Sequence, residues 1–396
     1  MSVLPIDPSR FYANSEKYRE TAYPFESQSP VSTTDTLVKA PQNDPFGKPI
    51  TKTTVAPTPS LTTEQKMFGE VEVPCFDLSD IHSEVEIRIL METWMKVGFI
   101  GVKSSSLEPY IDRVYDVMRK YFNQPLDLKM RDWHGNNGQT GFGPEGLEAA
   151  KGRKVSDRKQ TFFISPDMSK WPAGMLEFKE AIEAYRNELK KYISKFLDCF
   201  LAYTKVKVCN VDDMLNSSNN LLRLAYYPAP RSTDDPEMKG AAAHEDVNWA
   251  TFMPRPTDKG LKLLPKEDKT KDDETKEDET KEDRWKSVVV PKGYILINTG
   301  ELAALLTNNE DFKAITHRVD NVGERYSMPF FASFPPEYDL GKYTVGEHLQ
   351  SRLIEMGSVP LENITEETVK HLREVGLLQA PRKELVDKYP QYFKLV

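Results

Sequence analysis

Hydrophobic residues recur along this chain with two different periods, and the change from one to the other divides it into regions. Residues 71–78 alternate apolar and polar side chains, which predicts a short strand. Residues 84–96 instead place apolar side chains on one helical face, and residues 98–102 return to a strand pattern. The first ordered part of the chain is therefore predicted to be a β-α-β unit.

Helical spacing returns in two longer segments before the middle of the chain. Tyr110, Val114, Val117 and Tyr121 fall on one face of a predicted helix, and residues 176–203 continue the same spacing over a greater length. Both segments are expected to be helices that pack one face against a core.

From residue 221 onward the pattern changes to short strands separated by turn residues, with a helical stretch at residues 302–306. The strands are predicted at residues 221–227, 249–253, 261–264, 287–290, 294–298, 317–319 and 328–334. Seven short strands favour a sandwich or jelly roll. The predicted fold class is therefore α+β, with a helical region before a β core.

The same patterns predict four regions. Residues 1–68 are rich in Pro, Ser and Thr and lack periodicity, which is typical of a disordered tail. Residues 69–205 hold the helical region, and residues 206–345 hold the β core. Within the core, residues 266–283 form a charged run without any apolar side chain. We expect this run to be a solvated hairpin insert, because strands continue on both sides of it.

Residues 346–396 form the fourth region, a C-terminal extension. Helical patterns are present around residues 345–354 and 366–374, and a segment with Pro and Tyr follows. We hypothesise that this extension covers the mouth of an active site in the β core.

Charge and cysteine content narrow the class of partners. The formal net charge is −8 and no basic stripe is present, so nucleic acid is not expected to bind. No apolar run approaches the roughly 20 residues of a membrane span. Cys75, Cys199 and Cys209 lack a CxxC spacing, which favours a reducing compartment. We expect a monomer in the cytoplasm, with the nucleus as an alternative location.

Two histidines and one aspartate are the candidate metal ligands. His244 and Asp246 are two positions apart, a spacing that places both side chains on the same side of an extended chain. His317 follows a predicted strand and a short helix, and it supplies a third ligand. Two imidazoles and one carboxylate on one face of an octahedron leave three positions open, as non-haem Fe(II) chemistry requires.

A candidate anion site follows the second histidine. Arg325 lies eight residues after His317, and Ser327 is two residues further on the same side of the next strand. A guanidinium fork with a neighbouring hydroxyl suits a buried carboxylate.

Short motifs carry a resemblance to a known family over roughly residues 71–345. In chain order they are VPCFDL (73–78), VGFIGV (97–102), TGFGP (140–144), DRKQTF (157–162), RLAYYP (223–228), HED (244–246), VPKG (290–293), NTGE (298–301), LTN (306–308), THRV (316–319) and RYS (325–327). In their order and spacing they resemble the isopenicillin N synthase-like 2-oxoglutarate/Fe(II)-dependent dioxygenases. His244 and His317 are 73 positions apart, and the 18-residue charged insert lies between them, as a lengthened hairpin would.

The resemblance implies a distorted double-stranded β-helix with Fe(II) at its mouth, bound by His244, Asp246 and His317. By the same likeness, Arg325, Ser327 and Tyr227 would hold the distal carboxylate of 2-oxoglutarate. Dioxygen would be the second co-substrate, with ascorbate as a candidate reductant. The expected reaction oxidises a small organic molecule by hydroxylation, desaturation or ring closure.

The resemblance also places aromatic residues around the iron, although each could instead be an ordinary core residue. They are Phe142, Phe162, Trp249 and Phe331. Two departures from plant members, Ala225 and Gln160, argue against a plant hormone or flavonoid substrate.

Three alternatives remain open from the sequence. The first is an oxidase that resembles isopenicillin N synthase and uses no 2-oxoglutarate. The second is a catalytically idle oxygenase fold that serves as a nutrient-sensing or regulatory binding module. The third is a zinc hydrolase, because two histidines and one carboxylate also bind zinc, but no HExxH motif is present.

Overall fold

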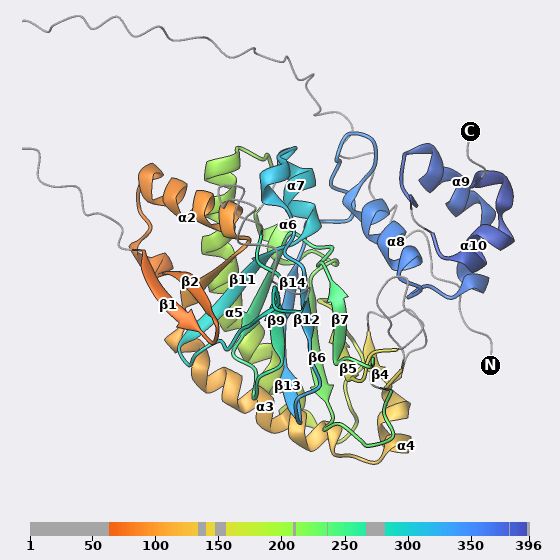
Figure 1. Cartoon of the computed structure of the whole chain (residues 1–396), viewed down its shortest axis with the longest axis horizontal. Coiled ribbons are helices and arrows are strands. Elements are labelled where there is room, and N and C mark those ends of the chain that lie inside the picture. Colours follow the sequence, from red (N-terminus) through yellow and green to blue (C-terminus); the bar gives the residue numbers. More distant parts are fainter. Residues whose placement is uncertain are drawn as a thin grey trace, which may run out of the picture.

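The structure is a computed structural model, and it describes residues 63–133, 140–146, 156–208, 211–235, 237–266, 282–379 and 381–393. Two β-sheets face each other, and long helices cover the outer face of the larger sheet (Figure 1). Most of the predicted insert and most of the predicted tail lie outside the described residues.

The larger sheet has ten strands, and it takes them from both halves of the chain. Its order is β1 (Glu64–Phe68), β2 (Val71–Phe76), β3 (Phe99–Lys103), β11 (Tyr294–Thr299), β8 (Ala250–Pro254), β14 (Phe330–Ala332), β6 (Leu221–Tyr227), β5 (Gln160–Ile164) and β4 (Gly141–Gly143), with β13 (Arg325–Ser327) also paired to β6. Strands β2 and β3 are parallel, as the predicted β-α-β unit requires. Pairing of β3 with β11 and of β5 with β6 joins the region before residue 205 to the β core.

The smaller sheet has four strands and closes the jelly roll. Its order is β10 (Lys286–Ser287), β9 (Leu261–Leu263), β12 (His317–Val319) and β7 (Ala241–His244). An apolar cluster that includes Tyr227, Leu263 and Leu296 fills the space between the two sheets. Strands β9 and β10, which precede and follow the predicted charged insert, pair antiparallel.

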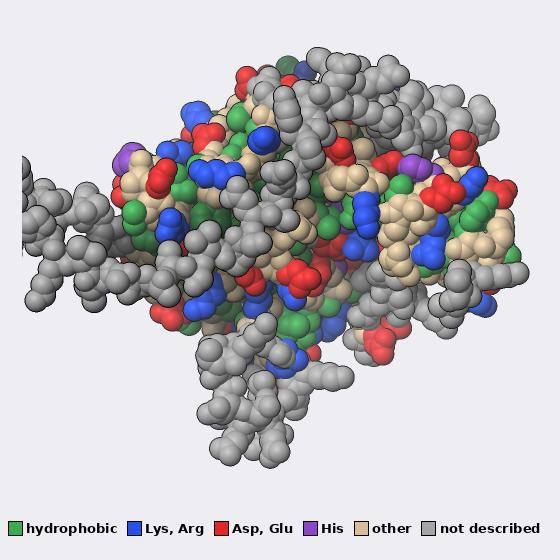
Figure 2. All heavy atoms as spheres, turned by 90° about the horizontal axis from the view of Figure 1, so that it is seen from above, with side chains coloured by type: hydrophobic (Ala, Val, Ile, Leu, Met, Phe, Trp, Pro, Cys, Tyr) green, Lys and Arg blue, Asp and Glu red, His purple; other side chains and the backbone are tan. Residues whose placement is uncertain are grey.

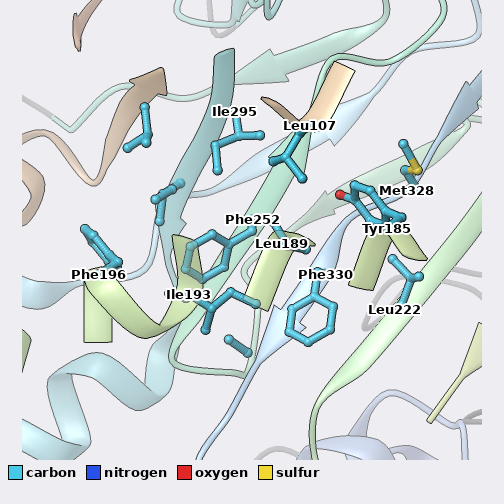
Figure 3. Packing of buried hydrophobic residues seen from close by; sticks show 14 of the residues in the cluster. Leu107, Tyr185, Leu189, Ile193, Phe196, Leu222, Phe252, Ile295, Met328 and Phe330 are labelled. Atoms are coloured by element: carbon cyan, nitrogen blue, oxygen red, sulfur yellow. The ribbon is translucent and has the colours of Figure 1, made fainter. Parts of the chain in front are cut away.

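Helices α2 (Glu84–Val97), α3 (Glu108–Phe122) and α5 (Leu176–Thr204) follow the predicted segments closely. Figure 3 shows how α5 contributes Leu189, Ile193 and Phe196 to the core against Phe252 and Phe330 of the larger sheet. Short helices α4 (Leu126–Lys129), α6 (Val211–Leu215) and α7 (Glu301–Thr307) occur in connections. Within the described residues, no helix combines the length and apolarity needed to cross a bilayer.

The C-terminal extension forms its own small helical unit beside the end of β7 (Figure 1). It contains α8 (Val345–Glu355), α9 (Glu366–Glu374) and α10 (Lys383–Lys388). Helix α8 begins at Thr344, where the Thr344 and Glu347 side chains form a capping box. A separate apolar cluster that includes Ile354, Leu372 and Leu385 holds the three helices together. The two predicted helical patterns at residues 345–354 and 366–374 are confirmed.

Several of the predicted strands and boundaries need correction. The predicted tail runs to residue 68, but Glu64–Phe68 is strand β1, because the turn at Gly69 (φ 72°) lets it pair with β2 and fully buries Phe68. The strand predicted at residues 287–290 is reduced to Lys286–Ser287. Strand β7, with the sequence AAAH, was missed because it is short and shows no alternation.

Candidate metal centre and active-site cavity

The three candidate metal ligands meet at the mouth of the jelly roll. His244 ends β7 and His317 begins β12, and the antiparallel register places these two residues opposite each other. Their imidazole centroids are 4.3 Å apart. Asp246 follows β7 by two residues, and its Oδ1 lies 3.7 Å from the Nε2 atom of each histidine.

Each imidazole is oriented by a backbone carbonyl. The Nδ1 atom of His244 lies 2.8 Å from the Ala242 carbonyl oxygen, and Nδ1 of His317 lies 3.2 Å from the Ile315 carbonyl oxygen. Because a carbonyl oxygen only accepts a hydrogen bond, Nδ1 is the protonated nitrogen in both rings. The Nε2 lone pair of each ring is therefore directed at the shared site, as a metal ligand requires.

The carboxylate of Asp246 is held in a similar way. Its Oδ2 accepts hydrogen bonds from Thr251 Oγ1 at 2.6 Å and from Asn298 Nδ2 at 3.0 Å, which leaves Oδ1 facing the two imidazoles. Burial alone would raise the pKa of Asp246, but the positive charge of a neighbouring imidazole, when protonated, and the hydrogen bonds from Thr251 and Asn298 outweigh burial and hold the pKa below its usual value. Asp246 is therefore ionised at neutral pH.

The protonation of His244 also suits a metal. Burial, with the neighbouring His317, lowers the pKa of His244 to about 3. The imidazole is therefore neutral and its Nε2 lone pair is free for a metal at neutral pH.

A close backbone contact fixes the loop that carries Asp246. The backbone N–H of Glu301, at the start of α7, donates to the Asp246 carbonyl oxygen at 2.8 Å. A Cβ atom at Gly300 would lie only 1.9 Å from the Asn248 carbonyl oxygen. Glycine is required at this position because the 246–248 loop and the start of α7 touch here.

These groups fit one metal ion. Two atoms that ligate the same ion at about 2.1 Å can be no more than about 4.2 Å apart, and the two Nε2–Oδ1 separations of 3.7 Å satisfy this limit. All three ligand atoms lie within 4.8 Å of one another, and His244, Asp246 and His317 are the one such group found among the described residues. Two nitrogens and one carboxylate oxygen suit Fe(II) and leave coordination positions open.

The candidate anion site lies deeper in the jelly roll. Arg325 is paired with Tyr227 across β13 and β6, and Ser327 follows on the same face opposite Ala225. The Arg325 guanidinium carbon lies 4.9 Å from the centre of the Tyr227 ring, and Nε donates to the Asp258 carbonyl oxygen at 3.2 Å. Arg325 is 3% exposed, and its buried Nη1 has no hydrogen-bond partner. The sequence prediction of a buried arginine beside Ser327 and Tyr227 thus agrees with the geometry.

A cavity of about 570 Å³ opens beside the metal ligands. Its floor includes His244 and Asp246, and one side is lined by Val345, His348 and Arg352 of α8. We call the lining residues of α8 the C-terminal wall: Val345, His348, Leu349, Arg352, Leu353 and Glu355. The wall places the C-terminal extension at the active-site mouth. Tyr227, Arg325 and Ser327 do not line this cavity and lie in or beside the apolar cluster between the sheets.

Charged groups join the C-terminal wall to α7. Arg352 donates to Glu301 at 2.7 Å and to the buried Glu355 at 2.8 Å. His348 Nε2 lies 3.6 Å from Glu301 Oε2, and burial, reinforced by the Arg352 cation, lowers the pKa of His348 to about 4.

On the surface facing the viewer in Figure 2, acidic and basic side chains are interspersed, without a large area of one sign.

The aromatic residues expected near the iron divide into two groups. Phe331 lines the cavity, whereas Phe142, Phe162 and Trp249 belong to the core that packs against the helices. Phe163, the neighbour of Phe162 on β5, lines the cavity instead. The difference follows from strand alternation, which sends successive side chains to opposite faces.

Several polar residues of the site were not predicted from the sequence. Asn298 and Thr251 orient Asp246, and Arg223 and Lys159 line the cavity. Asn298 is the first residue of the NTGE motif (298–301), but the motif does not show that its side chain bonds to Asp246. Arg223 could have been found from the alternation of β6, which places it on the same face as Ala225 and Tyr227.

A jelly roll with two imidazoles and one carboxylate at its mouth defines the class of protein, a non-haem metal oxygenase. Two family descriptions match the chain. Residues 73–181 match "non-haem dioxygenase in morphine synthesis N-terminal" and residues 218–333 match "2OG-Fe(II) oxygenase superfamily", together more than half of the chain.

Curated relatives agree with these matches. The chain is 24% identical over 282 residues to 2-oxoglutarate-dependent dioxygenase 11 of Oryza sativa subsp. japonica, covering 68% of this chain and 73% of the relative. It is 25% identical over 318 residues to Jasmonate-induced oxygenase 3 of Arabidopsis thaliana, covering 74% and 76%. The fold is similar to that of a full-length Neurospora crassa protein solved in complex with alpha-KG, with a TM-score of 0.56, 18% identity and coverage of 72% and 96%.

The chain therefore belongs to the 2OG-Fe(II) oxygenase superfamily. It is an Fe(II)- and 2-oxoglutarate-dependent dioxygenase with an α+β jelly-roll fold, as the sequence predicted. Neither an oxidase without 2-oxoglutarate nor an idle binding module is favoured by these matches.

Proposed function

We propose that this enzyme oxidises a small organic molecule at one Fe(II) ion held by His244, Asp246 and His317. The observation that carries the proposal is the convergence of Nε2, Nε2 and Oδ1 on one point, with the second polar atom of each side chain already bonded to protein. Ligands held in this way are oriented before the metal arrives.

We infer that Arg325, Ser327 and Tyr227 bind the distal carboxylate of 2-oxoglutarate. The unpartnered Nη1 of Arg325 supports this role, because a buried guanidinium N–H without an acceptor is costly unless a ligand supplies one. Ser327 adds a hydroxyl donor on the same strand face. The Tyr227 ring lies against the guanidinium and keeps it in place.

The overall reaction balances with dioxygen as the oxidant. One oxygen atom enters succinate as 2-oxoglutarate loses carbon dioxide, and the other enters the substrate as a hydroxyl group or leaves as water after desaturation or ring closure. When bound, Fe(II) supplies the activation of dioxygen that links these two oxidations. The protein supplies two imidazoles, one carboxylate and a cavity lined by both apolar and polar side chains, which positions the substrate.

The relatives support a small-molecule substrate without identifying it. Gibberellin 3-beta-dioxygenase 1 of Arabidopsis thaliana is 24% identical over 299 residues. Because specificity depends on the cavity and not on the metal ligands, we do not transfer that substrate to this chain. Ascorbate remains a candidate reductant.

We further infer that the enzyme acts as a monomer in the cytoplasm. Cys75 and Cys199 are buried free thiols, which supports a reducing compartment. Gel filtration with light scattering would test the oligomeric state, and a mass of two chains would contradict it.

Anaerobic reconstitution tests the proposed function. Full-length protein is mixed with Fe(II) and 2-oxoglutarate, the weak visible charge-transfer band of the chelate is recorded, and succinate is measured after oxygen is admitted. We expect the band and succinate from the wild type and neither from His244→Ala, whereas the exposed control His82→Ala retains both. Oxygen uptake without succinate would contradict the use of 2-oxoglutarate.

A further inference from the structure

Arg223 lies on the cavity face of the larger sheet. Along β6, the side chains of Leu221, Arg223, Ala225 and Tyr227 share one face, because alternate residues of a strand point the same way. Leu222 and Leu224, on the other face, belong to the core under the helices. Arg223 therefore faces the same side of the sheet as the proposed co-substrate residue Tyr227, four residues further along β6.

Two phenyl rings hold the Arg223 guanidinium in a fixed position. Its carbon lies 5.3 Å from the centre of the Phe163 ring and 4.8 Å from the centre of the Phe331 ring. All three residues line the cavity that includes His244. Contacts with ring faces leave the in-plane N–H groups of a guanidinium available for a ligand.

Arg223 lacks an anionic partner among the described residues. The other two cations of the cavity are paired: Lys159 Nζ lies 2.8 Å from Asp157 Oδ2, and Arg352 bonds to Glu301 and Glu355. The Nε atom of Arg223 is buried without a hydrogen-bond partner. Arg223 itself is half-buried and lines the cavity, so a cation without a protein anion at this position is available to pair with an anionic ligand through charge-assisted hydrogen bonds.

The strand register relates Arg223 to the metal ligands. Phe331 of β14 is paired with Leu221 of β6 on one side and with Thr251 of β8 on the other. Thr251 is the residue whose hydroxyl bonds to Asp246. Strands β6 and β8 flank β14, so their axes are roughly 10 Å apart. A small molecule bound to Arg223 can thus extend across the Phe331 ring towards the metal site.

We propose that Arg223 binds a carboxylate of the substrate, so that the enzyme oxidises an organic acid with an apolar body; this inference rests on the proposed function. The apolar body would contact Leu221, Phe163, Phe331 and Leu302 in the cavity. Two of the carboxylates that line the cavity, Glu301 and Glu355, lie on α7 and α8 and disfavour an acid group on that side. A phosphate dianion would bring two charges to one guanidinium, which favours a carboxylate.

Matched acids and amides test this proposal directly. The probes are 4-phenylbutyrate and 1-naphthylacetate, each compared with its primary amide. Binding to the full chain is measured by anaerobic calorimetry, first with Fe(II) and 2-oxoglutarate and then without them. We expect at least one acid to bind wild-type protein about tenfold or more tightly than its amide, as a charge-assisted hydrogen bond implies.

Three variants separate the role of Arg223 from a general defect. Arg223→Gln should lower the affinity of the acid to that of the amide, and Arg223→Lys should recover part of the difference because it retains the charge. Arg113→Gln, which removes an exposed arginine paired with Glu180 at 3.2 Å, should behave as the wild type. The 2-oxoglutarate charge-transfer band should be unchanged in all three variants, and thermal unfolding identifies any variant that fails to fold.

Several results would overturn the proposal. Equal affinity for acid and amide, or no binding of any probe at millimolar concentration, would contradict a carboxylate site. Loss of the 2-oxoglutarate band in both Arg223→Gln and Arg223→Lys would reassign Arg223 to the co-substrate. Absence of the band in wild-type protein would instead contradict the proposed function, while the measurements without iron would still decide whether Arg223 selects acids.

Discussion

The metal-ligand end of the cavity and its C-terminal wall are stabilised by different forces. At the metal end, strand register sets His244 opposite His317, and hydrogen bonds from Thr251 and Asn298 fix Asp246. The C-terminal wall is joined to α7 through Arg352, whose side chain is 34% exposed. Buried backbone-based contacts are stronger determinants of geometry than part-exposed ion pairs, which water screens.

The two regions are therefore expected to have different roles. The described contacts that orient the side chains of the three candidate ligands come from β7, β8, β11 and Ile315 just before β12, and none of them comes from α8. Changes at the metal end should therefore reduce iron binding, and changes in the wall should alter stability or access while iron binding is kept.

The largest effect is expected from His244→Ala. Loss of a residue that only orients a metal ligand commonly lowers metal affinity about 10–100-fold, so loss of a ligand should exceed about 100-fold. Iron retained after anaerobic dialysis measures the effect, and His82→Ala is the matched control. Equal iron retention by His244→Ala and wild-type protein would remove His244 from the metal site.

The next largest effect is expected from Gly300→Ala. The new Cβ would collide with the Asn248 carbonyl oxygen, so the 246–248 loop must shift. Overpacking of this kind costs about 1–3 kcal/mol of unfolding free energy, and iron affinity should fall with it. Urea unfolding and a chelator competition measure the two quantities. At Gly323 a Cβ would meet its nearest atom at 3.8 Å, so Gly323→Ala should leave both nearly unchanged.

Thr251→Val should have a smaller effect that is limited to the metal. The substitution keeps the side-chain shape but removes the hydroxyl that bonds to Asp246 Oδ2 at 2.6 Å. We expect iron affinity to fall about tenfold, and Thr251→Ser to restore it. If Thr251→Val binds iron as the wild type does, this hydrogen bond does not position the carboxylate.

A change in the C-terminal wall should alter how the free energy of unfolding depends on pH and should leave iron affinity unchanged. Burial and the Arg352 cation lower the pKa of His348 from 6.5 to about 4 in the folded protein, with Glu355 opposing the shift. Between pH 6.5 and 4 the unfolded chain binds more protons at this residue, so the free energy of unfolding falls as the pH falls. Above pH 6.5 both states are neutral and the effect vanishes.

Substitution of His348 isolates this contribution. In iron-free protein, His348→Gln should lose less stability than the wild type between pH 6.5 and 4, by up to about 1.4 kcal/mol per pH unit. Urea unfolding at several pH values measures the difference, and iron affinity at neutral pH should be unchanged. Parallel pH profiles for the two proteins would show that His348 is not held neutral by the fold.

The candidate metal ligands could be predicted from the sequence more completely than the cavity around them. His244, Asp246 and His317, which the structure brings together, could be proposed because the chemistry restricts the residue types and the motifs retain their order. Helices α3 and α5 could be predicted because many apolar residues in each repeat at helical spacing. Cavity residues such as Arg223 are harder to predict, because strand alternation shows which residues share a face but does not show which strands become neighbours or which face lines the cavity.

The missed elements show the same limit. Strand β7 has only four residues and lacks alternation, yet it carries His244, and its place is set by pairing with β12. Strand β13 is also short and is defined by pairing with β6. Long-range pairing of this kind cannot be deduced from local periodicity.

The central claim is that two imidazoles and Asp246 share one ferrous ion. Crystals grown without oxygen in the presence of Fe(II) and 2-oxoglutarate would test it by anomalous diffraction at the iron absorption edge. We predict one anomalous peak, bonded to Nε2 of His244, Nε2 of His317 and Oδ1 of Asp246. A peak elsewhere in the chain, or none at this position in crystals that contain iron, would contradict the account.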